Sequence, residues 1–174
     1  MPEATVTQRD DGSFPNARDW RAVSPGACHK VLQHNAFITG FRQAGADRFE
    51  LLAEIDAERE QHFFDHPIDH VPGMLSACII RQAALVVFHE GWGASYQDKY
   101  LLDRVAAAFH SFADHAKAIR VEALAVDVKR RGDKVLQATI RSRLSQGASP
   151  FAEGEATIRA FSPAAYERIH RRGR

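Results

Sequence analysis

The residues best suited to chemistry gather in the stretch HFFDHPIDHVPGMLSACIIRQ, which spans residues 62–82. Two acid–imidazole pairs stand there four residues apart, Asp65–His66 and Asp69–His70. A histidine beside a carboxylate can polarise a carbonyl group or carry a proton near neutral pH. The first pair, Asp65 and His66, either lines a catalytic site or only pins a loop through hydrogen bonds. Asp69 is expected to orient that first pair or to cap the helix that follows.

Three histidines of this stretch, His62, His66 and His70, are spaced by four residues. On a helix that spacing would line one face, as metal ligands do. Pro67 and Pro72 argue against a helix here, because proline removes a backbone N–H and clashes with the preceding turn. We therefore expect a loop over residues 57–71, without a metal or another cofactor.

A long apolar helix is predicted to follow this loop. Pro72 suits a first helical turn, where a missing N–H costs nothing. The sequence GMLSACIIRQAALVVFHE continues the helix, which should stop near Gly91 and Gly93. Apolar residues cover nearly its whole circumference, and such a helix is normally buried on most sides.

The first turn of this helix offers backbone N–H groups that have no partner within the helix. We expect those at Gly73, Met74 and Leu75 to hold the oxygen of a substrate carbonyl, as an oxyanion hole does. Because almost any helix offers such donors, the preceding Asp-His-Pro loop is what makes this helix start a candidate.

Two side chains of the helix, Arg81 and Cys78, stand out among apolar neighbours. A buried guanidinium needs an anion, because an unpaired one costs several kcal/mol. Its partner is either an internal acid such as Asp65 or Glu90, or a phosphate or carboxylate of substrate, which arginine binds in a bidentate fork. Cys78 is either a nucleophile in its thiolate form or a small buried apolar residue.

The rest of the chain predicts strands. The segments VEALAVDVK and VLQATIRSRL alternate between apolar and polar residues, and RRGD between them is typical of a hairpin turn. One apolar helix with strands before and after it indicates an α+β protein in which a curved antiparallel sheet wraps the helix, the shape called a hotdog fold. The predicted strands are Asn35–Phe41, Arg48–Asp56, Arg104–Phe112, Ala118–Lys129, Lys134–Leu144 and Phe151–Phe161.

The length of 174 residues indicates one domain. We divide the chain into an extended or flexible segment over residues 1–27, the hotdog domain over 28–162, and a tail over 163–174 that begins with a short helix. A net charge of +1 gives no reason to expect nucleic acid as a partner.

The two cysteines, Cys28 and Cys78, are fifty residues apart and are expected to be free thiols. The N-terminus is polar and unlike a secretory signal. The longest apolar stretch, Ile79–Phe88, is interrupted by polar residues and is too short to span a bilayer. We expect a cytoplasmic protein that does not bind membranes.

The motif at residues 63–75 resembles the A-factor biosynthesis (AfsA-type) hotdog family, whose repeated domain carries FFDHP-x-DHVPGML followed by E-x-x-RQ. Here Phe63–Leu75 match the first phrase, and Arg81 and Gln82 match the RQ. His29 and Lys30 are similar to the His-Lys opening of that domain. The resemblance covers roughly residues 28–162 and identifies the chain as a single-domain member. A more distant similarity links it to the β-hydroxyacyl thioester dehydratases.

The resemblance implies an acyltransferase-like enzyme of signalling-molecule or secondary-metabolite biosynthesis. Its substrate would be an acyl thioester, such as a β-ketoacyl group, on acyl carrier protein or coenzyme A, and its acceptor dihydroxyacetone phosphate. Family members commonly carry two repeats, so a single repeat is expected to work as a homodimer. The implied catalytic residues are Asp65, His66, Cys78 and Arg81, and the implied substrate contacts are His70, Gly73, Met74, Leu75 and Gln82.

One departure from the family pattern matters. Cys78 stands three residues before Arg81, where the resemblance places a helical acid. A carboxylate there would serve as a general base. Two alternatives therefore stay open, a dehydratase or thioesterase on acyl carrier protein or coenzyme A substrates, and a non-catalytic acyl-binding or partner subunit, including one in a heterodimer.

Overall fold

Alternating apolar residues form the long strands of this protein. In the computed structural model, which describes residues 20–56 and 69–172, Ile119, Val121 and Ala123 are buried on one face of a strand while Glu122 and Leu124 are exposed on the other. Side chains alternate in this way because successive residues of a strand point to opposite faces. In chain order the elements are β1 (Arg21–Ala22), the turns η2 (Pro25–Cys28) and η3 (Gln33–Asn35), β2 (Ile38–Gln43), β3 (Arg48–Ala53), α1 (Gly73–Val86) with its π-helical continuation η4 (Val87–Gly91), β4 (Lys99–Phe109), β5 (Ile119–Arg131), β6 (Lys134–Gln146), β7 (Ser149–Phe161) and α2 (Pro163–Arg172).

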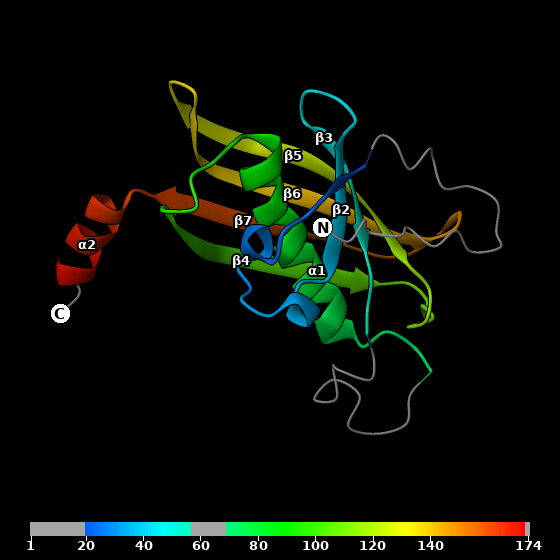
Figure 1. Ribbon diagram of the computed structural model, residues 1–174. Helices are drawn as coiled ribbons and strands as arrows, with labels where there is room; N and C mark the ends of the chain where they lie inside the picture. Colours follow the sequence, from blue (N-terminus) through cyan, green and yellow to red (C-terminus); the bar gives the residue numbers. More distant parts are fainter. Residues whose placement is uncertain (1–19, 57–68, 173–174) are drawn as a thin grey trace.

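The described strands form one antiparallel sheet in the order β1-β2-β3-β5-β6-β7-β4. The chain leaves β3, passes through α1, and returns as β4 at the opposite edge of the sheet, where it pairs with β7 (Figure 1). The connections between β5, β6 and β7 are short hairpins. Among the described strands β4 pairs with β7 alone, so its other edge has backbone groups without a partner strand in that part of the chain.

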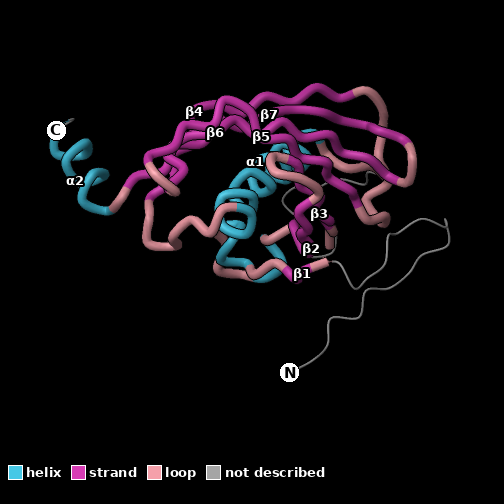
Figure 2. Tube along the Cα trace, turned by 90° about the horizontal axis from the view of Figure 1, so that it is seen from above, coloured by secondary structure: helices cyan, strands magenta, loops and turns pink. Residues whose placement is uncertain are grey.

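Helix α1 lies inside the curve of the sheet, which arches over it (Figure 2). Its residues Gln82–Val86, and the three that follow, are buried. Close approach depends on glycine at two places. A Cβ on Gly91 would lie 2.8 Å from the Phe49 ring, and a Cβ on Gly154 would lie 2.7 Å from Ile80 Cδ1 and overlap the carbonyl oxygen of Ala106. The predicted hotdog fold is confirmed.

Most of the predicted strands shift by a few residues at one or both ends, and larger differences concern β4 and the two ends of the described chain. Strand β4 runs over Lys99–Phe109 rather than 104–112, because its pairing with β7 begins at Lys99–Phe161 and includes residues that follow a turn-rich segment. The predicted extended or flexible segment, residues 1–27, contributes β1 and most of η2 to the fold, while Cys28, the last residue of η2, belongs to the predicted domain. Helix α2 continues to Arg172, so the basic end of the chain is helical up to that residue.

The segment Gly73–Gly91 is, among the described residues, the single helix long and apolar enough to cross a membrane when judged by length and composition alone. This helical segment is longer than the apolar stretch Ile79–Phe88 of the sequence, because it includes the first turns of α1 and its continuation η4. However, 67% of its apolar window is buried inside the fold, which is the pattern of a core helix.

We predict that Gly154→Ala lowers the free energy of unfolding by about 1–3 kcal/mol, because the added methyl group forces α1 and β4 away from β7. Gly45→Ala is the matched control, since its Cβ would meet only the Arg48 side chain at 3.6 Å. Urea denaturation of both variants measures the difference. Equal stability of the two variants would contradict the packing role of Gly154.

Candidate functional site

A part-exposed stripe runs along the N-terminal half of α1. Met74 is 69% exposed, and Cys78 and Arg81 are half-buried. Residues at i, i+4 and i+7 share one face of a helix, so these three side chains line the same stripe. It adjoins edge strand β4, whose Phe109 ring packs so closely on Gly73 that a Cβ there would lie 3.2 Å from Phe109 Cζ. The structure thus brings together three of the predicted site residues.

The start of α1 offers fewer free donors than the sequence predicts. Pro72 occupies the N-cap position, and no side chain caps the helix. The N–H of Leu75 donates to the carbonyl of Pro72 at 3.0 Å, and the Leu75 side chain is fully buried, so Leu75 is not a free donor. The N–H groups of Gly73 and Met74 have no partner among the described residues, and they are the donors left for a carbonyl oxygen.

The second acid–imidazole pair, Asp69 and His70, lies in the segment that leads into α1. Asp69 Oδ1 lies 3.2 Å from His70 Nδ1, and this contact lowers the pKa of the Asp69 carboxyl. The His70 ring packs against Phe112, and the N–H of Val71 donates to the carbonyl of Ala113 at 2.7 Å. Asp69 therefore contacts His70 rather than capping α1. His70 remains 35% exposed beside the helix start. The predicted roles of His62, Asp65 and His66 fall outside the described residues.

Arg81 has no hydrogen bond or ion pair with any described residue. Glu90, one of its two predicted internal partners, lies instead 4.0 Å from Arg21 and accepts a hydrogen bond from Tyr96. Burial raises the pKa of the Cys28 thiol to about 11, and the nearby Arg81 charge only partly opposes this rise. The Arg81 charge also adds to the lowering of the His29 pKa, which burial dominates. Within the part of the chain that the structure describes, no carboxylate pairs with the half-buried Arg81 guanidinium, which is a state in which arginine can bind an anion. Asp65, its other predicted internal partner, lies outside that part.

Gln82 has a structural role. It is 1% exposed, its Oε1 accepts from the N–H of Phe37 at 2.8 Å, and its Nε2 donates to the carbonyl of Asn35 at 2.8 Å. These bonds hold the start of β2 against α1. The predicted substrate contact is not the arrangement found, because a buried amide that satisfies backbone groups has no free surface for a ligand.

A second polar cluster lies at the other end of the helix. His29 Nε2 and His89 Nε2 are 2.9 Å apart, and the rings of Tyr96 and Tyr100 pack around them. Burial and the neighbouring charges of His89 and Arg81 lower the pKa of His29 to about 4, and burial lowers that of His89. Both imidazoles are therefore neutral at pH 7. Sequence reasoning missed His89, although a histidine directly after the apolar run ALVVF was a signal of a polar group inside the core.

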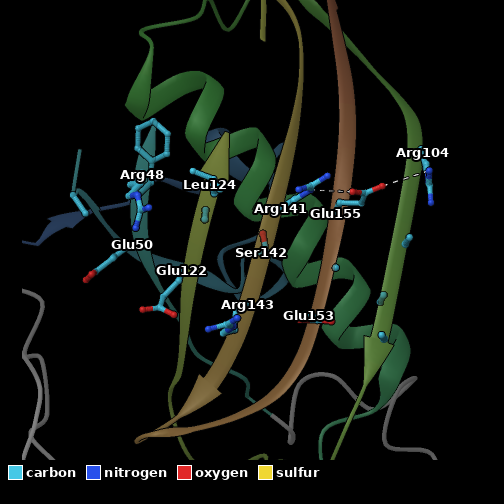
Figure 3. Close-up of a pocket in the computed structure, with 17 residues that line it drawn as sticks. Arg48, Glu50, Arg104, Glu122, Leu124, Arg141, Ser142, Arg143, Glu153 and Glu155 are labelled. Carbon is cyan, nitrogen blue, oxygen red and sulfur yellow. Dashed lines mark ion pairs between the residues drawn. The ribbon is translucent and has the colours of Figure 1, made fainter. Parts of the chain in front are cut away.

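The sheet face that points away from α1 carries a hollow of about 990 Å³ (Figure 3). Arginine and glutamate side chains alternate across it; Arg104 and Arg141 both contact Glu155, at 3.5 Å and 3.6 Å. Cross-strand ion pairs of this kind are normal on a solvated sheet face and contribute little stability. None of the predicted site residues lines the hollow. We therefore place the candidate site on the helix side of the sheet.

The antiparallel sheet wrapped around one central helix defines a hotdog protein, and solved structures agree. The chain is similar to AziG from S. sahachiroi, with a TM-score of 0.53 and 14% identity over 72% of this chain and 91% of that one. It is also similar to the dehydratase heterocomplex ApeI:P from Xenorhabdus doucetiae, with a TM-score of 0.61 and 8% identity over 79% of this chain and 91% of that one. At these identities the likeness concerns the fold.

The sequence comparison identifies the family. The model of the A-factor biosynthesis hotdog domain matches residues 13–162, and the chain belongs to this family. A relative from Streptomyces coelicolor, named 2-oxo-3-(phosphooxy)propyl 3-oxoalkanoate synthase, is 28% identical over 97% of this chain and 55% of its own length. A relative of the same name from Streptomyces virginiae is 24% identical over 81% of this chain and 49% of its own length. The chain spans about half the length of these relatives.

Proposed function

We propose that this domain transfers a β-ketoacyl group from a thioester to the hydroxyl group of a small phosphorylated acceptor, in the biosynthesis of a signalling molecule. Family membership supports this reaction, because the name of the Streptomyces relatives describes an ester of a 3-oxoalkanoate with a phosphooxypropyl group. The observation that carries the proposal is the α1 stripe, where Arg81 has no acidic partner among the described residues. The proposed acceptor is dihydroxyacetone phosphate, and the proposed compartment is the cytoplasm.

The proposed step forms one bond and breaks another. The acceptor oxygen attacks the thioester carbonyl carbon, the carbon–sulfur bond breaks, and the hydroxyl proton ends on the leaving thiolate. The N–H groups of Gly73 and Met74 stabilise the oxygen that becomes negative during the attack. Asp65 and His66, which precede the helix in the sequence, remain our candidates for moving the proton. Arg81 holds the acceptor phosphate through a bidentate contact.

A second copy of the domain is proposed to complete the site. Strand β4 has an unpaired edge and carries exposed apolar side chains on the helix side: Leu102 is 41%, Val105 42% and Phe109 53% exposed. Such an edge pairs readily with another strand. Pairing of two β4 strands would bring the α1 stripe of one protomer beside the sheet of its partner. An acyl chain would then be covered on both sides.

The direct test is incubation of the purified protein with β-ketoacyl thioesters of carrier protein and of coenzyme A, with and without dihydroxyacetone phosphate, followed by mass spectrometry. We expect the ester to form only with the acceptor. Arg81→Ala should lower kcat/KM for the phosphorylated acceptor by about 10²-fold, because a charge-assisted contact of 1.5–3 kcal/mol is lost. Arg104→Ala, on the opposite face of the sheet, is the control. Full activity of Arg81→Ala would refute the phosphate contact.

The effect of a Cys78 substitution on turnover, together with the product formed, distinguishes the candidate mechanisms and enzyme classes. If its half-buried thiol only packs against the core, Cys78→Ala keeps turnover close to that of the unchanged protein. Loss of turnover in a correctly folded Cys78→Ala variant, together with an acyl adduct on Cys78 in the unchanged protein, would indicate a covalent intermediate instead. Free acid or an unsaturated thioester as product would favour the thioesterase or dehydratase alternative, and binding without turnover would favour an acyl-binding subunit.

We predict that Val105→Glu disrupts the dimer, since a charge on the apolar edge is costly to bury. Leu136→Glu is the matched control, because Leu136 is similarly exposed, at 37%, but lies on the inner strand β6. Light scattering coupled to size-exclusion chromatography gives the mass of each. A dimeric Val105→Glu variant, or a monomeric unchanged protein, would contradict pairing through β4.

A further inference from the structure

The hydrogen bonds of the histidine pair fix which nitrogen of each ring carries a proton. His89 Nδ1 lies 2.9 Å from the carbonyl oxygen of Ala94, and a carbonyl can only accept, so Nδ1 of His89 is the protonated nitrogen. In neutral His89 the other nitrogen, Nε2, is then an acceptor. It accepts from His29 Nε2 at 2.9 Å. Neutral His29 therefore keeps its lone pair on Nδ1, which has no partner among the described residues.

The backbone holds His29 at the surface above the buried His89. His89 is 5% exposed. His29 is exposed as a whole residue, but its ring is partly covered where it contacts His89 and Tyr100. His29 ends the turn η2 in a left-handed conformation, with φ 55° and ψ 43°. This conformation is unfavourable for a residue with a Cβ and is often found at functional sites. The arrangement is that of a surface imidazole oriented by a buried one.

Tyrosine side chains form a cavity of about 430 Å³ in front of His29. The Tyr96 ring is stacked on His89 at 4.2 Å, and Tyr100 meets both imidazoles edge-on. Both phenol groups have fixed acceptors, since Tyr96 donates to Glu90 and Tyr100 donates to the carbonyl of Ser95. Burial keeps the pKa of both phenols above the usual value, so they stay protonated. Tyr166 of α2 adds a further wall.

The cavity has one uncompensated positive charge. Asp98 lines it but forms an ion pair with Lys134 at 2.8 Å. Lys99 also lines it and has no ion pair with any described residue. His29 is neutral at pH 7 because its pKa is lowered to about 4. The lining thus combines one cation, one orientated acceptor and aromatic walls, which is a set of groups suited to a small polar ligand.

We propose that this cavity is a second binding site, for a small organic anion that carries a hydroxyl group. The hydroxyl donates a hydrogen bond to Nδ1 of His29, and the anionic group pairs with Lys99. His89 is a positioning residue that fixes the proton of His29. The lining of this site does not include Gly73, Met74 or Arg81, although the Arg81 charge reaches His29. The proposal therefore does not rest on the proposed acyl transfer.

Matched ligand pairs test the proposal. Glycerol 3-phosphate is compared with methyl phosphate, and glycolate with acetate, because only the first member of each pair has a carbon-bound hydroxyl group. Binding is followed by the histidine ¹⁵N resonances at pH 7. We expect the hydroxylated member of at least one pair to bind about tenfold more tightly and to shift Nδ1 of His29, as one hydrogen bond predicts. The pair that responds tells whether the anion is a phosphate or a carboxylate.

Variants assign the two contacts. We expect two variants, His29→Asn and Lys99→Met, each to weaken binding about tenfold. Asparagine is chosen at position 29 because it tolerates the left-handed backbone conformation. His110→Asn, at the other end of β4, should leave binding unchanged. The proposal fails if neither hydroxylated ligand moves the His29 resonances, if methyl phosphate and acetate bind equally well, or if the two site variants bind like the control. Because no turnover is measured, these outcomes are separate from success or failure of the acyl-transfer assay.

Discussion

Burial of one apolar helix is the constraint on which the rest of this structure depends. Helix α1 and its continuation have apolar side chains on nearly every side, and a flat sheet would cover only one of them. The strands therefore curve over the helix, and glycines at positions 91 and 154 let the layers approach. Burial of apolar area on this scale is the main stabilising contribution in a domain of this size. Gln82 adds two hydrogen bonds that hold the segment before β2 on the remaining side.

This arrangement leaves a single strip of the helix uncovered along its N-terminal half, and the candidate site lies there. In the described part of the chain Met74, Cys78 and Arg81 face outward, because the sheet and the turn η2 contact α1 on its other faces and Gln82 bonds to Asn35 of η3. The same geometry makes β4 an open edge beside that strip. A second hotdog unit paired with this edge would cover its apolar side chains and would also place protein atoms beside Arg81. The proposed dimer and the proposed reaction therefore depend on the same surface.

The two ends of α1 differ in the chemistry that they offer. The N-terminal end presents backbone donors and a cation to an open surface. The C-terminal end holds a neutral histidine pair within a tyrosine-lined cavity, with the proton positions fixed by a carbonyl group. The two proposals therefore concern different chemistry, an acyl transfer along the helix and the binding of a small anion at its end.

The sequence by itself determined the family, the hotdog fold and the position of the core helix. The motif at residues 63–75 is dense, and an all-round apolar segment can fold only where other elements surround it. It also identified Arg81 as a side chain in need of an anion. It did not determine the partners of polar side chains, because these depend on contacts between distant residues. Gln82 is matched to Asn35 and Phe37, and His29 to His89, sixty residues away. Strand β4 likewise begins where β7 pairs with it rather than where local alternation begins. Only the tertiary structure distinguishes the neighbours Arg81 and Gln82, because consecutive helical residues point about 100° apart, so that Gln82 faces the buried side and Arg81 the part-exposed one.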